Sequence, residues 1–195
     1  NPEGLIFFEK EGTLKKYDYS QELIWKKNIY SKQEKKSDIL INLAYENDIL
    51  VITDNLAKYY AINSKNGELI WSKTNLTPFN SQIKIYKDKF YIVDYENILH
   101  CFSIKDGNKI WSYQTDNFFV KSKKKLSIII ENEKVIFNNS IGDITTLDAN
   151  KGILLWQIPT QNNLVYAESA SLITSDLVLE KDSIFFSNNR NEFYS

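Results

Sequence analysis

The sequence is poor in the residues that define several protein classes. Its 195 residues include one cysteine, Cys101, one histidine, His100, and three prolines. A single cysteine allows no disulfide within the chain, which excludes a disulfide-stapled scaffold. Six glycines are too few for collagen or for a Gly/Pro low-complexity segment. No apolar run approaches the roughly 18 residues of a membrane-spanning helix.

An excess of one charge is also missing. The chain has 24 basic and 25 acidic residues, and Arg190 alone among the basic residues is arginine. Proteins that bind nucleic acids rely on a basic surplus and on the two-pronged arginine side chain. We therefore expect no nucleic-acid partner. Methionine is absent as well, so we expect the sequence to begin at a processed or fragment boundary, where a signal peptide or lipid anchor cannot be read.

What the sequence does contain is an internal repeat. Its four tryptophans are spaced by 46, 40 and 45 residues, and three of them close the pattern Gly-x-x-x-Trp. The first copy, Gln21–Trp25, lacks the glycine. An aliphatic residue precedes every tryptophan. The residues that define the repeat are Trp25, Gly67, Trp71, Gly107, Trp111, Gly152 and Trp156.

Each copy of the repeat predicts four short strands. In the second copy they cover about 39–45, 49–53, 57–63 and 69–73, and the alternation Ile39, Ile41, Leu43 indicates one buried face. Four antiparallel strands per 40–46 residues are typical of a β-propeller blade. A β-sandwich would not need the same motif four times. We predict an all-β protein, a β-propeller of four-stranded antiparallel blades.

The repeat also predicts the blade boundaries within a single propeller segment, 1–195. Complete blades are expected at about 38–75, 80–116 and 125–160, with partial blades at about 4–30 and 170–195. An arc of blades leaves strand edges unpaired. We therefore expect the chain to be a fragment of a longer propeller, or to self-associate through its open edges.

The run Tyr59–Trp71 resembles the PQQ-like repeat, whose pattern is roughly L-Y-A-L-D-x-x-T-G-x-x-x-W. Ile144–Trp156 matches about as well, and Leu99–Trp111 matches more loosely. The resemblance implies a propeller in which each tryptophan lies between adjacent blades, so the repeat residues are expected to be structural. It also implies two kinds of function, because the repeat occurs in quinoprotein dehydrogenases and in BamB-type lipoproteins of bacterial outer-membrane assembly.

The residues that could carry chemistry are few. By resemblance, a quinoprotein dehydrogenase would have two adjacent cysteines above the PQQ cofactor and a Ca²⁺ site, but Cys101 is alone and no contiguous acidic Ca²⁺ loop occurs. His100 has no neighbours at metal-ligand spacing. We interpret it as an ordinary strand residue, and Cys101 as a small buried side chain. No catalytic, cofactor-binding or metal-binding residue is predicted.

These patterns favour a non-enzymatic, extracytoplasmic propeller scaffold for protein–protein interaction. By resemblance, its role would be outer-membrane protein assembly in the periplasm, with a protein partner bound on loops at one face. Two alternatives remain open. One is a fragment of a PQQ-dependent quinoprotein dehydrogenase, and the other is a ligand-sensing ectodomain.

Overall fold

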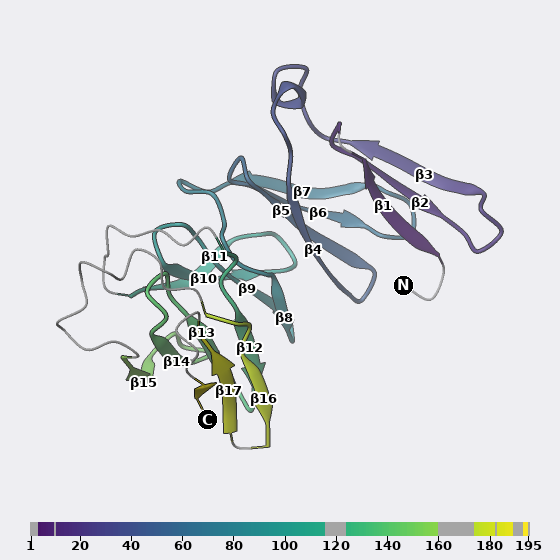
Figure 1. Ribbon diagram of the computed structural model, residues 1–195. Coiled ribbons are helices and arrows are strands. Elements are labelled where there is room, and N and C mark those ends of the chain that lie inside the picture. Colours follow the sequence, from purple (N-terminus) through teal and green to yellow (C-terminus); the bar gives the residue numbers. More distant parts are fainter. Residues whose placement is uncertain are drawn as a thin grey trace. The chain divides into compact units, whose positions relative to one another are not determined.

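A computed structural model describes residues 4–9, 11–115, 124–159, 174–181, 183–188 and 193–194 (Figure 1). Contacts divide the chain into two compact units. The first comprises Asn1–Pro78 with Ile104–Gly107, and the second comprises Phe79–Ser103 with Asn108–Ser195. Within the described ranges the regular elements are β-strands, apart from one short 3₁₀ helix, Glu34–Lys36. No helix in these ranges is long and apolar enough to cross a membrane.

The first unit holds two antiparallel sheets, ordered β1-β2-β3 and β4-β5-β6-β7. Alternating apolar residues give each strand a face that packs into a shared core. Leu14, Trp25, Ile52, Tyr60 and Ile62 are buried there together. The strands are β1 (Leu5–Glu9), β2 (Thr13–Tyr17), β3 (Leu23–Asn28), β4 (Ile41–Glu46), β5 (Ile49–Asp54), β6 (Lys58–Asn63) and β7 (Leu69–Thr74).

The second unit holds two four-stranded sheets and one three-stranded sheet, ordered β8-β9-β10-β11, β12-β13-β14-β15 and β16-β17-β18. Its strands are β8 (Lys84–Tyr86), β9 (Lys89–Val93), β10 (Ile98–Ser103), β11 (Lys109–Gln114), β12 (Ile128–Glu131), β13 (Lys134–Asn138), β14 (Ile144–Asp148), β15 (Leu154–Ile158), β16 (Val178–Glu180), β17 (Ser183–Ser187) and β18 (Phe193–Tyr194). One core cluster joins the middle strands of the two four-stranded sheets around Tyr91, Leu99, Val135 and Leu147.

Three four-stranded sheets and two three-stranded sheets in the described ranges confirm the predicted architecture of three full blades and two partial ones. That all of them belong to a single propeller segment stays a prediction. The 3₁₀ helix Glu34–Lys36 was not expected. Two reciprocal hydrogen bonds hold the turn that leads into it, because Ser31 N donates to Glu34 Oε2 at 2.7 Å and Glu34 N donates to Ser31 Oγ at 3.3 Å.

A β-bulge recurs at the same place in four sheets. Ala61 pairs with Trp71, but the next residue, Ile62, pairs with Leu69, so Ile70 is the extra residue of the bulge. The same register shift occurs in the three sheets that contain Trp25, Trp111 and Trp156. A bulge leaves its extra residue unpaired and redirects the side chains beside it. The aliphatic residue before each tryptophan is this extra residue, which accounts for its exposure of 43–47% in every copy.

Candidate functional site: the tryptophan–glycine contacts

Three of the repeat tryptophans each lie against the glycine of the following sheet's last hairpin. A Cβ atom at Gly67 would lie 2.8 Å from the Trp25 ring, one at Gly107 would lie 2.7 Å from Trp71, and one at Gly152 would lie 2.6 Å from Trp111. The three glycines have φ between +67° and +74°. Glycine is therefore required twice over, because other residues are strained at this φ and their Cβ would overlap the indole.

A hydrogen bond fixes two of these tryptophans to the same hairpin. Trp25 Nε1 donates to the carbonyl of Ser64 at 3.0 Å, and Trp71 Nε1 donates to that of Ile104 at 2.8 Å. Each carbonyl belongs to the residue three positions before the glycine. Buried indole N–H groups usually find such a partner. The hairpin thus offers both a flat glycine surface and an acceptor to the tryptophan.

The third contact keeps the glycine but replaces the donor. Ala149 holds the equivalent carbonyl, and it accepts a hydrogen bond from Tyr91 Oη at 2.9 Å. Trp111 Nε1 is buried without a partner in the described structure. The Tyr91 ring packs against the Trp111 ring, with centroids 5.8 Å apart. The tyrosine has therefore taken over the acceptor that the indole uses in the other two contacts.

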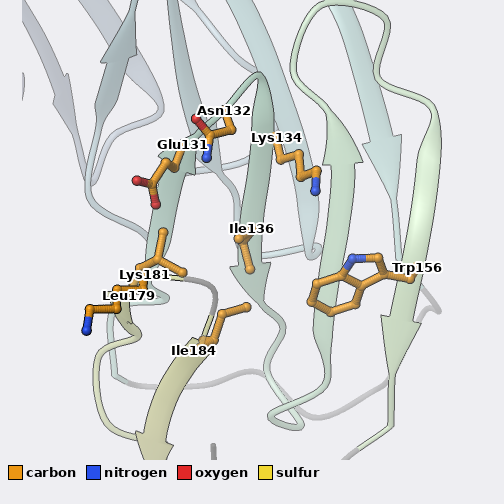
Figure 2. Close-up of a pocket in the computed structure, with 8 residues that line it drawn as sticks. All are labelled: Glu131, Asn132, Lys134, Ile136, Trp156, Leu179, Lys181 and Ile184. Atoms are coloured by element: carbon orange, nitrogen blue, oxygen red, sulfur yellow. The ribbon is translucent and has the colours of Figure 1, made fainter.

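Trp156 differs from the other three. None of the described glycines has the Trp156 ring in such contact. Instead, Trp156 lines a pocket of about 250 Å³, which we call the Trp156 pocket. Figure 2 shows Ile136 of β13 at the centre of the lining, with the indole of β15 to its right and Ile184 of β17 below it. Lys134, Lys181 and Glu131 are charged residues of the lining.

A second recurring feature is an Asp or Asn at the turn between the second and third strands of each full blade. Asp54 Oδ1 accepts hydrogen bonds from Leu56 N and Lys58 N, both at 2.9 Å. Asp94 and Asn139 accept the corresponding two amides of their own turns. These side chains satisfy backbone donors that the turn would otherwise bury unpaired. Their role is structural.

Because the sheet β12-β13-β14-β15 uses Asn139 in this role, Asp54→Asn should cost at most about 1 kcal/mol. Asp54→Ala should cost about 2–3 kcal/mol, since it leaves two turn amides without an acceptor. Burial raises the pKa of Asp54, although the Tyr30 hydroxyl and the turn amides oppose the shift. The ionised form is thus disfavoured in the folded state. Stability of the Asn variant relative to wild type should therefore rise as pH increases above about 3.8, the ordinary pKa. Urea melts of the three proteins from pH 3 to 7 would check this, and equal costs for Asn and Ala would contradict it.

The only histidine forms a buried pair that the sequence did not reveal. His100 Nε2 lies 2.9 Å from Asp94 Oδ2, and the two side chains are 4% and 2% exposed. The imidazole stacks on Phe102 at 5.5 Å between centroids, and Phe79 meets it edge-on at 6.2 Å. The pair is enclosed by aromatic rings, so a substrate in solvent has no access to it in this arrangement.

Cys101, beside it on β10, is also enclosed. Its side chain is fully buried. Burial raises the pKa of the thiol to about 12, which keeps it protonated at neutral pH. In the part of the chain that the structure describes, no three His, Cys, Asp or Glu side chains lie close enough together to hold a metal ion.

Comparison with known proteins identifies the fold. Residues 10–195 match the family described as outer membrane protein assembly factor BamB. Among solved structures, BamB from Moraxella catarrhalis is similar with a TM-score of 0.73 and 16% identity, over 96% of this chain and 56% of that one. The chain thus spans little more than half the length of that relative. No curated protein matches the sequence.

Two other solved structures are similar. The computationally designed Ika4 protein has a TM-score of 0.57 and 12% identity, over 73% of this chain and 83% of that one. Quinohemoprotein alcohol dehydrogenase from Comamonas testosteroni has a TM-score of 0.49 and 20% identity, over 60% of this chain and 20% of that one. At such identities these likenesses concern the fold. The family match and the repeated blades together show that the chain belongs to the family of the outer membrane protein assembly factor BamB, with the fold of a partial PQQ-like β-propeller.

Proposed function

We propose that the chain is a non-enzymatic scaffold that binds a protein partner in the periplasm, as part of outer-membrane protein assembly. The observation that carries this proposal is the family match over residues 10–195, whose description is an assembly factor. The side chains that could do chemistry also support it. His100 and Cys101 are enclosed in the core, and a side chain that no substrate can reach does not serve as a catalyst.

The surface of the blades supports a protein partner. The extra residue of each bulge presents an aliphatic side chain on the last strand of its sheet, at Ile24, Ile70, Ile110 and Leu155. The last strand of a sheet also presents backbone N–H and C=O groups that another chain can pair with. We propose each of these edge strands, β3 and β7 in the first unit and β11 and β15 in the second, as a surface that a partner can contact, in addition to the loops expected from the sequence.

Photo-crosslinking in the native cell tests the proposal. A photoreactive amino acid placed at Ile70 or Ile110 should crosslink to one defined protein of the outer-membrane assembly machinery. The same group at Leu43, an exposed aliphatic residue on the first strand of the sheet that contains Ile70, is the matched control and should crosslink much less. If neither strand position yields a protein adduct while the protein is folded, the scaffold proposal fails.

The rival function is a PQQ-dependent dehydrogenase. A ligand that binds only the folded state raises the melting temperature. We expect PQQ with Ca²⁺ to leave the melting curve of the purified chain unchanged up to millimolar concentrations. Saturable binding of PQQ with a higher melting temperature would favour the enzyme, and a shift with another small molecule would favour a ligand-sensing ectodomain.

A further inference from the structure

The four strands that carry the repeat tryptophans are all edge strands, but they differ in charge. β15 has the sequence Leu-Leu-Trp-Gln-Ile, without a charged residue. The other three strands carry lysines, which are Lys26 and Lys27 in β3, Lys73 in β7 and Lys109 in β11. Lysines on an edge strand oppose pairing with another chain. Among these four strands, β15 alone lacks that protection.

The residue that leads into β15 is also apolar. The position three residues before the tryptophan is exposed in all four copies of the repeat. Its occupants are, in chain order, Glu22, Glu68, Asn108 and Ile153. Ile153 is 58% exposed, and it is followed by Leu154 at 41% and Leu155 at 47%. Three consecutive aliphatic side chains thus face solvent where β15 begins.

This exposure is a property of the edge and does not depend on the sheet that follows. Leu23 and Leu69 stand two residues before tryptophans that pack on a glycine hairpin, and they are still 51% and 40% exposed. Leu154, at the same repeat position, is 41% exposed. The extra residue of the bulge is 43–46% exposed in the first three copies and 47% exposed at Leu155. The apolar edge would therefore stay open beside a complete neighbouring sheet.

We propose that β15 pairs with β15 of a second copy of this chain, antiparallel and about a two-fold axis. The strand suits itself as a partner because it is uncharged, so no like charges meet across the pair. Backbone N–H and C=O groups on its free side would form the new ladder, and Ile153, Leu154 and Leu155 would add apolar contacts. A two-fold pair uses the same surface on both copies, so it closes at a dimer. Two four-stranded sheets would become one continuous sheet.

The proposed contact is small and separate from the other edges. The bulge does not distinguish β15, because all four strands have one. A single pair of strands buries less than the roughly 1,600 Å² of a standard interface, so we expect a weak dimer with a Kd of about 10 μM to 1 mM. β15 belongs to a four-stranded sheet, so this contact differs from the self-association expected at the partial blades.

Sedimentation equilibrium of the purified chain, from micromolar to millimolar concentration, measures the dimer. The test variant carries Ile153→Glu and Leu154→Lys. Glutamate and lysine already occupy these repeat positions at Glu68 and Lys109, so the sheet should fold, and melting curves check that it does. The matched control is Leu69→Lys, because Leu69 stands at the repeat position of Leu154 and is 40% exposed against 41%.

Hydrogen exchange shows which strand forms the pair. Backbone amides that enter a new ladder exchange more slowly. Residues 153–158 should therefore gain protection as the chain concentration rises, whereas residues 69–74 should not. We expect the wild type and Leu69→Lys to dimerise alike, and the double variant to dimerise at least tenfold more weakly.

Several results would overturn the proposal. A chain that stays monomeric at millimolar concentration would do so, as would association that the double variant leaves unchanged, since another surface would then be the contact. An equal loss of the dimer in Leu69→Lys, or concentration-dependent protection confined to other strands, would also count against it. The proposal goes beyond the proposed function. Crosslinking at Ile70 and Ile110 tests β7 and β11, so either proposal can fail while the other stands.

Discussion

Gly107→Ala will lower the free energy of unfolding by about 2–4 kcal/mol. Gly107 has φ of +67°, and an L-residue in the left-handed region costs about 1–2 kcal/mol. The new methyl group would lie 2.7 Å from Trp71 Cε3, and forcing an extra carbon into a packed site costs about 1–3 kcal/mol. Alanine recovers about 0.4–1 kcal/mol by restricting the unfolded chain, which is too little to offset the two costs. Urea denaturation followed by far-UV circular dichroism measures the change.

A double-mutant cycle separates the two costs. In a Trp71→Phe background the ring is smaller, so the overlap with the methyl group falls while the backbone strain at residue 107 is unchanged. Gly107→Ala should then cost only about 1–2 kcal/mol, the part due to φ. If Gly107→Ala costs the same in both backgrounds, the glycine is required for its backbone conformation alone. The close approach of residue 107 to the Trp71 ring would then contribute nothing to the cost of Gly107→Ala.

Much of this fold could be predicted from the sequence because the repeat combines residues that few other structures require together. A tryptophan four residues after a glycine, repeated in step with four apolar segments, indicates blades without further information. The strands follow as well, since Ile39, Ile41 and Leu43 alternate with polar residues. The structure starts the first of these strands at Ile41, because Ile39 instead packs into the core cluster ahead of the strand.

Other features depend on pairings between strands that the sequence does not specify. The contact between His100 and Asp94 needs the register of β9 against β10, in which Ile92 faces His100. No local sequence pattern around His100 identifies Asp94 as its partner, although an acidic or amide residue recurs at the same turn position, at Asp54 and Asn139. The bulge at Ile70 is likewise a property of two strands. Its signal was present as an aliphatic residue before every tryptophan, but the exposure of that residue could not be inferred from its type.

The substitution of one hydrogen bond by another is harder still to predict. Trp25 and Trp71 each donate to the carbonyl three residues before their glycine. In the third contact, the equivalent carbonyl accepts its hydrogen bond from Tyr91 of the neighbouring sheet. Three copies of a motif therefore share a shape while differing in their hydrogen bonds. Packing of the ring on glycine is the conserved part of the interaction across the copies, so the ring should account for most of its stability.

Trp71→Ala is accordingly expected to cost about 3–5 kcal/mol, the range for removing a large buried aromatic side chain. Trp71 is 9% exposed, its ring meets Tyr59 at 5.8 Å, and its Nε1 donates to Ile104 at 2.8 Å. Removal leaves a cavity and deprives the Ile104 carbonyl of its donor. Trp111→Ala should cost a similar amount through its contact with Gly152. Trp71→Phe, which keeps part of the ring, should lose less.

Trp156→Ala is the matched control, because it removes the same side chain at the same repeat position. The Trp156 ring is half-buried and lines a pocket, whereas the Trp71 ring packs against the hairpin at Gly107. Less apolar surface is lost, and little new cavity forms, so the cost should be about 1–2 kcal/mol. Urea melts of the two alanine variants would compare these values directly. A Trp156→Ala cost equal to that of Trp71→Ala would mean that the Trp156 ring is as fully packed as the Trp71 ring.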